Sequence, residues 1–209
     1  MHEYRGVIHV HSTYSDGKGC VERITDAANR TRADFVILTD HNTMKAREEG
    51  HEGWHRGTLL LVGEEITPDT NADHYLAFGI ATAIAPSPDP AKNVEAVRRQ
   101  GGIGIIAHPT GGAFVKGTYV EYPWTNWEAG TFAGIEIWNH IYDITGKSRN
   151  IIQLVLYVLF PWLSPYGPEE GVLETWDYYV SQRGRRVVAI GGVDAHGIIG
   201  DYEDDFVTV

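Results

Sequence analysis

The chain has 209 residues, of which 43% are hydrophobic, and this is enough for one α/β domain with a sizeable core. Its formal net charge of −11 argues against nonspecific binding to nucleic acid or to an anionic membrane, because such binding needs a basic face. The single cysteine, Cys20, excludes an intrachain disulfide and favours a reducing, cytoplasmic compartment.

The first third of the chain alternates between strand-like and helix-like segments. Residues 6–11, "GVIHVH", have the pattern of a strand, and residues 20–32 have that of a helix ending in charged residues. Residues 34–40, "DFVILTD", are mostly apolar, as buried parallel strands are. We expect a second helix at residues 43–56.

The middle third continues this alternation. Strand patterns cover residues 58–67 and 74–80, and a helix pattern covers residues 90–100, with a proline near its start and "GG" after its end. Residues 103–108 predict another strand. Residues 109–130 have no regular pattern, so we expect a long loop whose aromatic side chains either line a pocket or pack in the core.

The last third predicts strands at residues 134–138, 185–192 and 204–209 and helices at residues 148–160 and 170–183. The most apolar run, "IIQLVLYVLFPWL", is shorter than the roughly 20 residues that a membrane span needs. It therefore indicates a core helix, with an oligomer contact as the alternative.

The alternation of strands and helices predicts a mostly parallel sheet, either open or closed into a barrel. Internal repeats, low-complexity tracts and interdomain linkers are absent from the sequence. We therefore expect a single domain over residues 1–209.

Six of the ten histidines stand at the end of a strand-like run or directly beside one. They are His9, His11, His41, His74, His108 and His196. Because ligands gather at the carboxyl ends of parallel strands, we expect these imidazoles to converge on one site.

Strand alternation suggests which of these side chains act together. His9 and His11 are two residues apart, so they face the same side of a strand and could chelate one metal ion; the alternative is a half-buried structural pair. Asp194 and His196 repeat this spacing near the other end of the chain. Asp16, in "SDG", either faces the same site or caps its own turn.

Two pairs of adjacent polar residues leave a choice open. Asp40 and His41 face opposite ways on an extended chain; we favour His41 as a ligand, with Asp40 either orienting it or capping a helix. Only one of Glu64 and Glu65 should face the site. The pair His51 and His55 predicts a solvated surface, and the role of His140 stays open. Cys20 and the serines near Asp16 are interpreted as turn or packing residues.

The set of motifs resembles that of the polymerase-and-histidinol-phosphatase (PHP) superfamily, in family order and over residues 6–200. The motifs are His9-x-His11, Ser15-Asp16-Gly17, Thr39-Asp40-His41-Asn42, Gly63-x-Glu65, His74, Ala107-His108-Pro109 and Gly192-Val193-Asp194-Ala195-His196. The segment "HYLAFGI" further resembles the branch that includes carbaryl and carbamate ester hydrolases. The resemblance implies a distorted (β/α)7 barrel of the PHP type. The family usually continues beyond the "DDFVTV" at the end of this chain, which implies a compact member or a shortened chain.

The resemblance also implies a site for two or three divalent metal ions at the carboxyl ends of the strands. His9, His11, Glu65 and Asp194 would hold one ion, and Asp16, His41 and His196 a second. Glu65 as a bridge, with His74 and His108, would hold the third; the family's Gly-x-Glu motif thereby selects Glu65 over Glu64. His9, His11, Asp16 and His196 are also the predicted catalytic residues.

Imidazole and carboxylate ligands without thiolate suit zinc, manganese or iron. The leading hypothesis is a metal-dependent hydrolase that uses a metal-bound hydroxide on a small, anionic phosphate ester. Three ions, three carboxylates and a hydroxide leave a formal charge of roughly +2, which favours a phosphate ester, whereas two ions leave about zero and favour a neutral ester or carbamate. Few cations lie near the motifs; the candidates Lys18, Lys45 and Lys116 are more typical of a solvated surface, and the lack of an evident arginine clamp counts somewhat against a phosphatase.

Three alternatives to the phosphoesterase remain. They are a carboxyl or carbamate ester hydrolase on the same metal site, an amidohydrolase-type enzyme and a noncatalytic metal-binding module. The amidohydrolase type fits less well, because it usually needs a bridging carboxylated lysine, and no strand end in this sequence carries a lysine.

Overall fold

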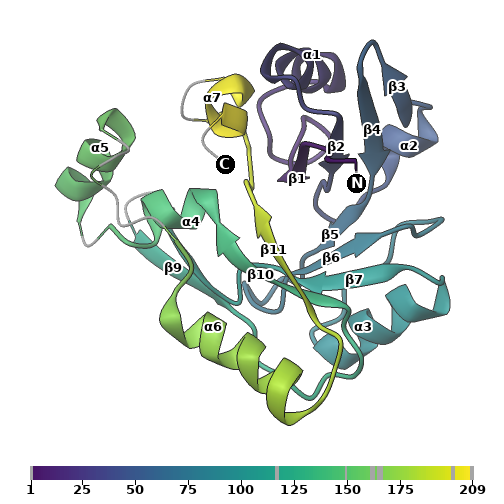
Figure 1. Ribbon diagram of the computed structural model, residues 1–209, viewed down its shortest axis with the longest axis vertical. Coiled ribbons are helices and arrows are strands. Elements are labelled where there is room, and N and C mark those ends of the chain that lie inside the picture. Colours follow the sequence, from purple (N-terminus) through teal and green to yellow (C-terminus); the bar gives the residue numbers. More distant parts are fainter. Residues whose placement is uncertain are drawn as a thin grey trace.

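Two β-sheets form the centre of the molecule in the computed structural model, which describes residues 2–115, 118–148, 150–160, 163, 167–198 and 201–207 (Figure 1). The first sheet has the order β1-β2-β4-β3, and its strands are β1 (Gly6–Val10), β2 (Phe35–Leu38), β4 (Thr58–Val62) and β3 (Gly53–His55). Neighbouring strands are parallel except at the edge strand β3.

The second sheet has the order β11-β10-β7-β6-β5. Its strands are β11 (Val188–Gly192), β10 (Gly134–Asn139), β7 (Ile103–Ile106), β6 (Tyr75–Phe78) and β5 (Glu64–Ile66). The first three are parallel, and β6 and β5 pair antiparallel. The predicted α/β class is confirmed, with two open sheets among the described residues in place of one.

The two sheets meet along the edge at which their parallel strands end. The strand predicted at residues 58–67 breaks at Gly63 into β4 and β5, and a Cβ at Gly63 would lie only 2.6 Å from the backbone oxygen of Ala77. Two isolated parallel bridges, Val10 to Ala195 and His41 to Glu65, join the sheets beyond their regular ladders. The histidine-rich segments therefore come together at this junction.

The helices lie around the sheets, and the one at residues 151–159 projects away from them (Figure 1). They are α1 (Val21–Thr31), α2 (Lys45–Glu48), α3 (Pro90–Arg99), α4 (His140–Thr145), α5 (Ile151–Leu159), α6 (Glu170–Asp177) and α7 (Tyr202–Val207). The helix predicted at residues 90–100 is confirmed: Asp89 caps it by accepting a hydrogen bond from the Ala91 N–H, and Pro90 opens its first turn. None of the described helices is both long enough and apolar enough to cross a membrane.

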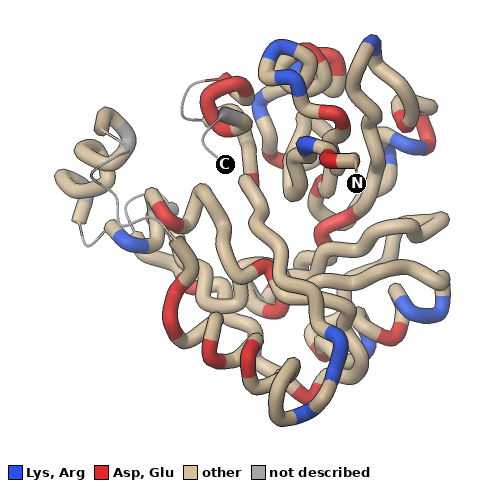
Figure 2. Tube along the Cα trace, viewed as in Figure 1, with Lys and Arg blue, Asp and Glu red and all other residues tan. Residues whose placement is uncertain are grey.

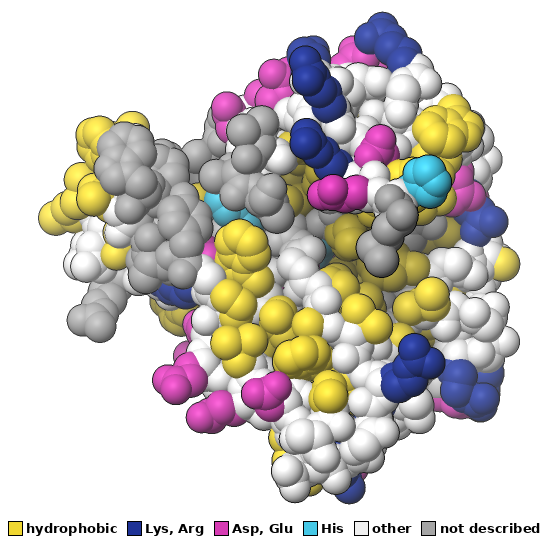
Figure 3. Space-filling model, viewed as in Figure 1, with side chains coloured by type: hydrophobic (Ala, Val, Ile, Leu, Met, Phe, Trp, Pro, Cys, Tyr) yellow, Lys and Arg dark blue, Asp and Glu magenta, His cyan; other side chains and the backbone are white. Residues whose placement is uncertain are grey.

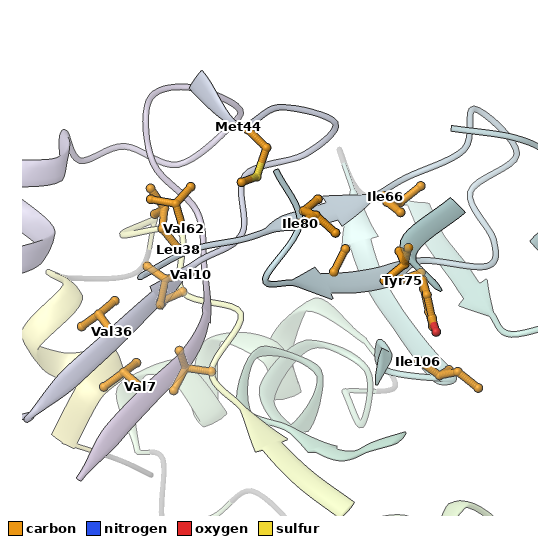
Figure 4. Close-up of a cluster of buried hydrophobic side chains, with 14 of the residues drawn as sticks. Val7, Val10, Val36, Leu38, Met44, Val62, Ile66, Tyr75, Ile80 and Ile106 are labelled. Atoms are coloured by element: carbon orange, nitrogen blue, oxygen red, sulfur yellow. The ribbon is translucent and has the colours of Figure 1, made fainter. Parts of the chain in front are cut away.

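The hydrophobic core is continuous across both sheets. Figure 4 shows Val10, Val36 and Leu38 of the first sheet in the same cluster as Tyr75 and Ile106 of the second. On α1, the buried Ile24, Ala27 and Ala28 follow the helical spacing of three and four residues, so one face of this helix packs inward.

Three predicted elements are wrong, and the apolar run expected to form a core helix is instead the largely exposed α5, in which Ile152 and Leu159 are 70% and 61% exposed. The helix expected at 43–56 shrinks to α2 and is followed by β3, because Gly50 and Gly53 adopt positive φ angles of 83° and 139° that end the helix. The loop expected at 109–130 contains a hairpin of β8 (Thr110–Val115) and β9 (Thr118–Pro123). Lys116 lies outside the described residues.

The strand expected at 204–209 is the helix α7, and residues 208–209 lie outside the described residues. Its acidic first turn suits the positive end of a helix dipole. The hydroxyl of Tyr202 donates a hydrogen bond to the backbone oxygen of His11 at 2.7 Å, and α7 packs against α1. These tertiary contacts decide the conformation of the segment against its alternating pattern.

Candidate metal centre

The structure brings all nine candidate ligands to the junction of the two sheets. His9 lies in β1 and Glu65 in β5, and the others follow or precede strands: His11 and Asp16 after β1, His41 after β2, His74 before β6, His108 after β7, and Asp194 and His196 after β11. His74 reaches the same edge from the start of its strand because β6 runs antiparallel to β7.

Glu65 lies at the centre of the cluster. Its Oε1 accepts hydrogen bonds from His74 Nδ1 at 2.8 Å and His108 Nε2 at 3.1 Å. Its Oε2 lies 3.1 Å from His41 Nδ1 and 3.3 Å from Nε2 of both His9 and His11. Glu65 therefore touches five of the six imidazoles.

Glu64 faces away from this cluster. Its Oε2 accepts a hydrogen bond from the Ile84 N–H at 2.9 Å, and its side chain is fully buried. Strand alternation thus separates the two glutamates, with Glu65 on the side of the histidines.

The remaining carboxylates, Asp194 and Asp16, both lie near His11 and His196 and differ in their other imidazole neighbours. Asp194 Oδ1 lies 3.3 Å from His9 Nε2 and 3.1 Å from His11 Nε2. Asp16 Oδ1 lies 3.3 Å from His196 Nε2, 3.6 Å from His41 Nε2 and 3.8 Å from His11 Nδ1.

Several buried nitrogen and oxygen atoms of the cluster, each able to bind a metal ion, have no hydrogen-bond partner. They are His9 Nε2, both ring nitrogens of His11, Glu65 Oε2, His74 Nε2 and His108 Nδ1. Burying such atoms without a partner is costly, and a cation bound between them would remove that cost. This donor set fits divalent metal ions.

Three groups of ligand atoms lie within 4.8 Å of one another. They are His11, Asp16, His41 and His196; His9, Glu65 and His108; and His9, His11 and Asp194. The second ion implied by the resemblance needs Asp16, His41 and His196, which the first group contains together with His11. His74 lies outside all three groups and touches Glu65 directly.

The carboxylates and imidazoles of the cluster shift one another's pKa values. Burial opposes ionisation of Glu65, but the imidazoles of His41 and His9 outweigh it and hold its pKa well below the usual range. Burial likewise lowers the pKa of His196, but Asp16 and Asp194 outweigh it and raise this pKa to about 9. Burial and the neighbouring His196 lower the pKa of His11 to about 4. Divalent cations would replace the protons that balance these carboxylates.

Sequence reasoning missed Glu136, which supports the cluster from β10. This buried carboxylate accepts hydrogen bonds from His9 Nδ1 at 2.8 Å, from the His108 N–H at 2.8 Å and from Asn139 Nδ2 at 3.0 Å. It fixes the ring of His9 so that Nε2 faces Glu65 and Asp194. A carboxylate in the middle of the apolar run "GIEIW" was the signal for it.

Asp40 organises the loop that carries Asp16. Its carboxylate accepts hydrogen bonds from the Ser12 N–H at 2.8 Å, the Ser12 hydroxyl at 2.7 Å and the Ser15 hydroxyl at 2.6 Å. Asp40 is thus neither the cap of α2, which begins after Met44, nor a hydrogen-bond partner of His41.

A cavity of about 650 Å³ opens above the cluster. Its lining residues are Asp16, His41, Glu65, His74, His108, Ala113, Tyr122, Ile141, Tyr142, Thr145, Leu154, Val155, Leu159, Asp194, His196 and Ile198. The aromatic residue Tyr122 comes from the segment expected to be a loop and lies over His74, with ring centroids 5.4 Å apart. His140 is buried at the start of α4 and does not line the cavity.

No family model matches the sequence, and no curated protein matches it significantly. Two solved structures share its architecture. One is a two-domain protein from Bacteroides vulgatus that contains a predicted PHP-like metal-dependent phosphoesterase; it is 18% identical, with a TM-score of 0.54, over 92% of this chain and 52% of that one. The other is a candidate metal-dependent phosphoesterase from Bifidobacterium adolescentis, 17% identical with a TM-score of 0.60, over 99% and 96% of the two chains.

The chain has the fold of these proteins. It spans about half the length of the first and nearly all of the second. At 17–18% sequence identity the similarity shows a shared fold and nothing more specific.

Proposed function

We propose that the chain is a metal-dependent hydrolase of the PHP superfamily that acts on a small phosphate ester. The observation that carries the proposal is the convergence of nine imidazole and carboxylate side chains, five of which have buried nitrogen or oxygen atoms without a hydrogen-bond partner. The names of the two structures that share the fold, both described as phosphoesterases, support the reaction class.

Two or three divalent ions, of zinc, manganese or iron, would be held by these nine residues. Glu65 would bridge, because its two oxygens face different sets of imidazoles. Bound there, such ions would supply Lewis-acid activation of water and of the substrate.

The chain's own groups position this chemistry. Glu136 fixes the His9 ring, and Asp40 holds the Ser12–Ser15 turn so that the half-exposed Asp16 stands at the mouth of the cavity. The hydroxyls of Ser12 and Ser15 both donate to Asp40, so neither is poised as a nucleophile.

A carboxyl or carbamate ester hydrolase on the same site is the second candidate. The cavity lining among the described residues holds no lysine or arginine, so a phosphate would depend on the metal ions alone for countercharge. Of the cations near the motifs, Lys45 extends toward Glu49, 3.6 Å away, and Lys18 is exposed. Carbamate hydrolysis would also match the branch suggested by "HYLAFGI".

Three further proposals follow from the sequence. We propose that the two open sheets correspond to a distorted (β/α)7 barrel, and the bridges from Val10 to Ala195 and from His41 to Glu65 support this. Residues 1–209 form one domain, supported by the core that runs through both sheets. The protein acts on a small molecule in the cytoplasm, supported by the single cysteine and the charge of −11.

Metal content and hydrolysis should be measured together on protein purified without added metal. We expect bound divalent metal and turnover of at least one ester in a panel of phosphate, carboxyl and carbamate esters. His9→Ala and Asp194→Ala should each remove metal and lower turnover by at least about 100-fold. The exposed His2 gives a matched control, His2→Ala, which should change neither.

Two outcomes would contradict the proposal. Unchanged metal content and hydrolysis in both site variants would exclude the cluster as the metal centre. Bound metal without turnover of any ester would favour a noncatalytic metal-binding module.

A further inference from the structure

The cavity above the metal centre has two chemically different parts. Its floor is formed by the imidazoles and carboxylates of the centre. Its walls are formed largely by apolar and aromatic side chains from the β8–β9 hairpin, α4, α5 and Ile198. A volume of about 650 Å³ lies well within the range of small-molecule pockets and leaves ample room beyond a reacting phosphate or carboxyl group.

The aromatic part of the wall lies directly over the centre. The rings of Tyr142 and His108 meet edge to face, with centroids 4.6 Å apart, and the rings of Tyr122 and Tyr142 lie 6.0 Å apart. Burial raises the pKa of Tyr142 well above its usual range, so this phenol stays neutral. A planar apolar group would find both ring faces and aliphatic side chains at this level of the cavity.

The outer wall is the helix α5, whose apolar side chains are partly open to solvent. Figure 3 shows hydrophobic side chains gathered on this helix at the left edge of the molecule. Val155 and Leu159 line the cavity, yet 49% and 61% of their surfaces are exposed. A hydrophobic ligand would cover this surface and remove it from water.

The described residues of the cavity wall include no basic side chain that could pair with an anionic group of the substrate. Figure 2 shows Lys and Arg on α1, α2, α3 and the β3–β4 turn, after α4 and before β11, and neither type occurs among the described residues that line the cavity. The charged groups there are the carboxylates Asp16, Glu65 and Asp194 and their neighbouring imidazoles. A second phosphate or carboxylate on the substrate would therefore be desolvated without a countercharge.

From these observations we infer that the substrate is an ester of an uncharged, hydrophobic alcohol or phenol, whose apolar part is bound by α4, α5 and the β8–β9 hairpin. The inference rests on the proposed function for the reacting group. The apolar wall itself does not depend on metal, so the metal-free protein binds the hydrophobic product alone.

Two adjacent residues of α5 give a matched pair for the test. Val155 lines the cavity, whereas Leu156 does not, and the two are similarly exposed, at 49% and 41%. The affinity of metal-free protein for 2-naphthol should be measured by calorimetry for wild type, Val155→Asp and Leu156→Asp. We expect Val155→Asp to weaken binding by roughly tenfold or more and Leu156→Asp to change it by less than about twofold.

Hydrolysis separates this inference from the proposed function. The metal-loaded enzyme should hydrolyse 2-naphthyl phosphate or 2-naphthyl acetate with a kcat/KM at least about tenfold above that for glucose 6-phosphate. Wall-dependent binding of 2-naphthol without any hydrolysis would refute the proposed function and leave the hydrophobic site standing. Preferred hydrolysis of glucose 6-phosphate, equal effects of the two variants on binding, or a change of oligomeric state in Val155→Asp in place of a change in affinity would overturn the inference.

Discussion

Glu136 is the residue that connects the two sides of the metal centre. One oxygen accepts from the ring of His9 and the other from the backbone of His108, so one carboxylate positions ligands that lie 99 residues apart in the chain (108 − 9). It has no contact with the open cavity, which makes it a positioning residue.

Glu136→Gln is expected to lower the affinity for divalent metal by about 10–100-fold, because His9 loses a charged acceptor at Nδ1 and its ring is held less firmly. The measurement is a competition titration with a chromogenic chelator. The matched control is Glu121→Gln, at an exposed glutamate on β9. Equal affinities for the two variants would show that Glu136 is merely structural.

Glu64 predicts a pH-dependent stability. Burial raises its pKa to about 7 from a usual value near 4.5, although the hydrogen bond from Ile84 opposes this. The folded state therefore binds the proton more tightly than the unfolded state, and stability falls as the pH rises from about 4.5 to about 7. The loss persists at higher pH.

Glu64→Gln should remove this part of the pH dependence and keep an acceptor for the Ile84 N–H. The variant should be more stable than wild type by about 2 kcal/mol at pH 8, with a small difference at pH 4.5. Urea unfolding of both proteins in the presence of a chelator measures this without a contribution from metal. Parallel pH profiles for the two proteins would contradict the prediction.

At the scale of elements, the strands that carry the site are irregular where the ligands stand. The ladder between β1 and β2 shifts register around His9, whose φ is 68°, and the ladder between β10 and β11 shifts just after Glu136. His108 and Asp194 also have positive φ angles, of 23° and 53°. Such backbone costs of order 1–3 kcal/mol per residue and is typical of functional sites.

The regular parts of these strands could be predicted from the sequence, whereas the bulges at the ligands could not. Apolar runs predicted β1, β2, β7, β10 and β11, the helical pattern predicted α1, and Pro90 with the glycines after residue 100 predicted α3, because these signals are local. Alternation placed His9 and His11 on one face, and their ring centroids do lie 5.2 Å apart, but a bulge at His9 intervenes between them. The β8–β9 hairpin packs against α4, and α7 is held by the hydrogen bond from Tyr202 to His11, so both elements have contacts outside their own segments.

The close approach of β11 to β10 leads to a further prediction. A Cβ at Gly192 would lie 1.8 Å from Glu136 Oε1 and 3.2 Å from His9 Cβ. Gly192→Ala should therefore displace Glu136 and lower metal affinity at least as much as Glu136→Gln. The neighbouring Gly191 is a matched control, because a Cβ there meets nothing closer than 3.5 Å.

Chelator titration of Gly192→Ala, Gly191→Ala and the double variant Glu136→Gln/Gly192→Ala tests whether Gly192→Ala lowers metal affinity by displacing Glu136. Since both site changes act through the same carboxylate, their effects should be strongly non-additive. Additive losses, or an equal loss in Gly191→Ala, would mean that Gly192 acts by another path.

At the scale of the whole molecule, the metal centre also links the two sheets, because each sheet contributes ligands to it. Ligands from β1 and β2 meet those from β5, β7 and β11, and a few backbone hydrogen bonds beyond the regular ladders, such as Val193 N–H to Ile8 O and Asn42 N–H to Glu65 O, also join the two sheets. Side chains far apart in the sequence thus share one charge-balanced cluster. The sequence motifs named the residues that converge here but not Glu136, and they assigned Asp40 to His41 or to a helix cap, because the hydrogen bonds of both carboxylates form only in the folded chain.

Metal binding should therefore stabilise the entire fold. A metal that binds only the folded chain at about 100 times its Kd adds about 2.7 kcal/mol, and for a chain of this length this raises Tm by roughly 5–10 °C. The measurement is thermal unfolding with a chelator and with added Mn²⁺ or Zn²⁺. The increase should shrink below pH 6, where protons compete for the imidazoles. Asp194→Ala should lose the increase and His2→Ala should keep it; equal Tm values with and without metal in the wild type would show that the cluster does not join the sheets through a bound ion.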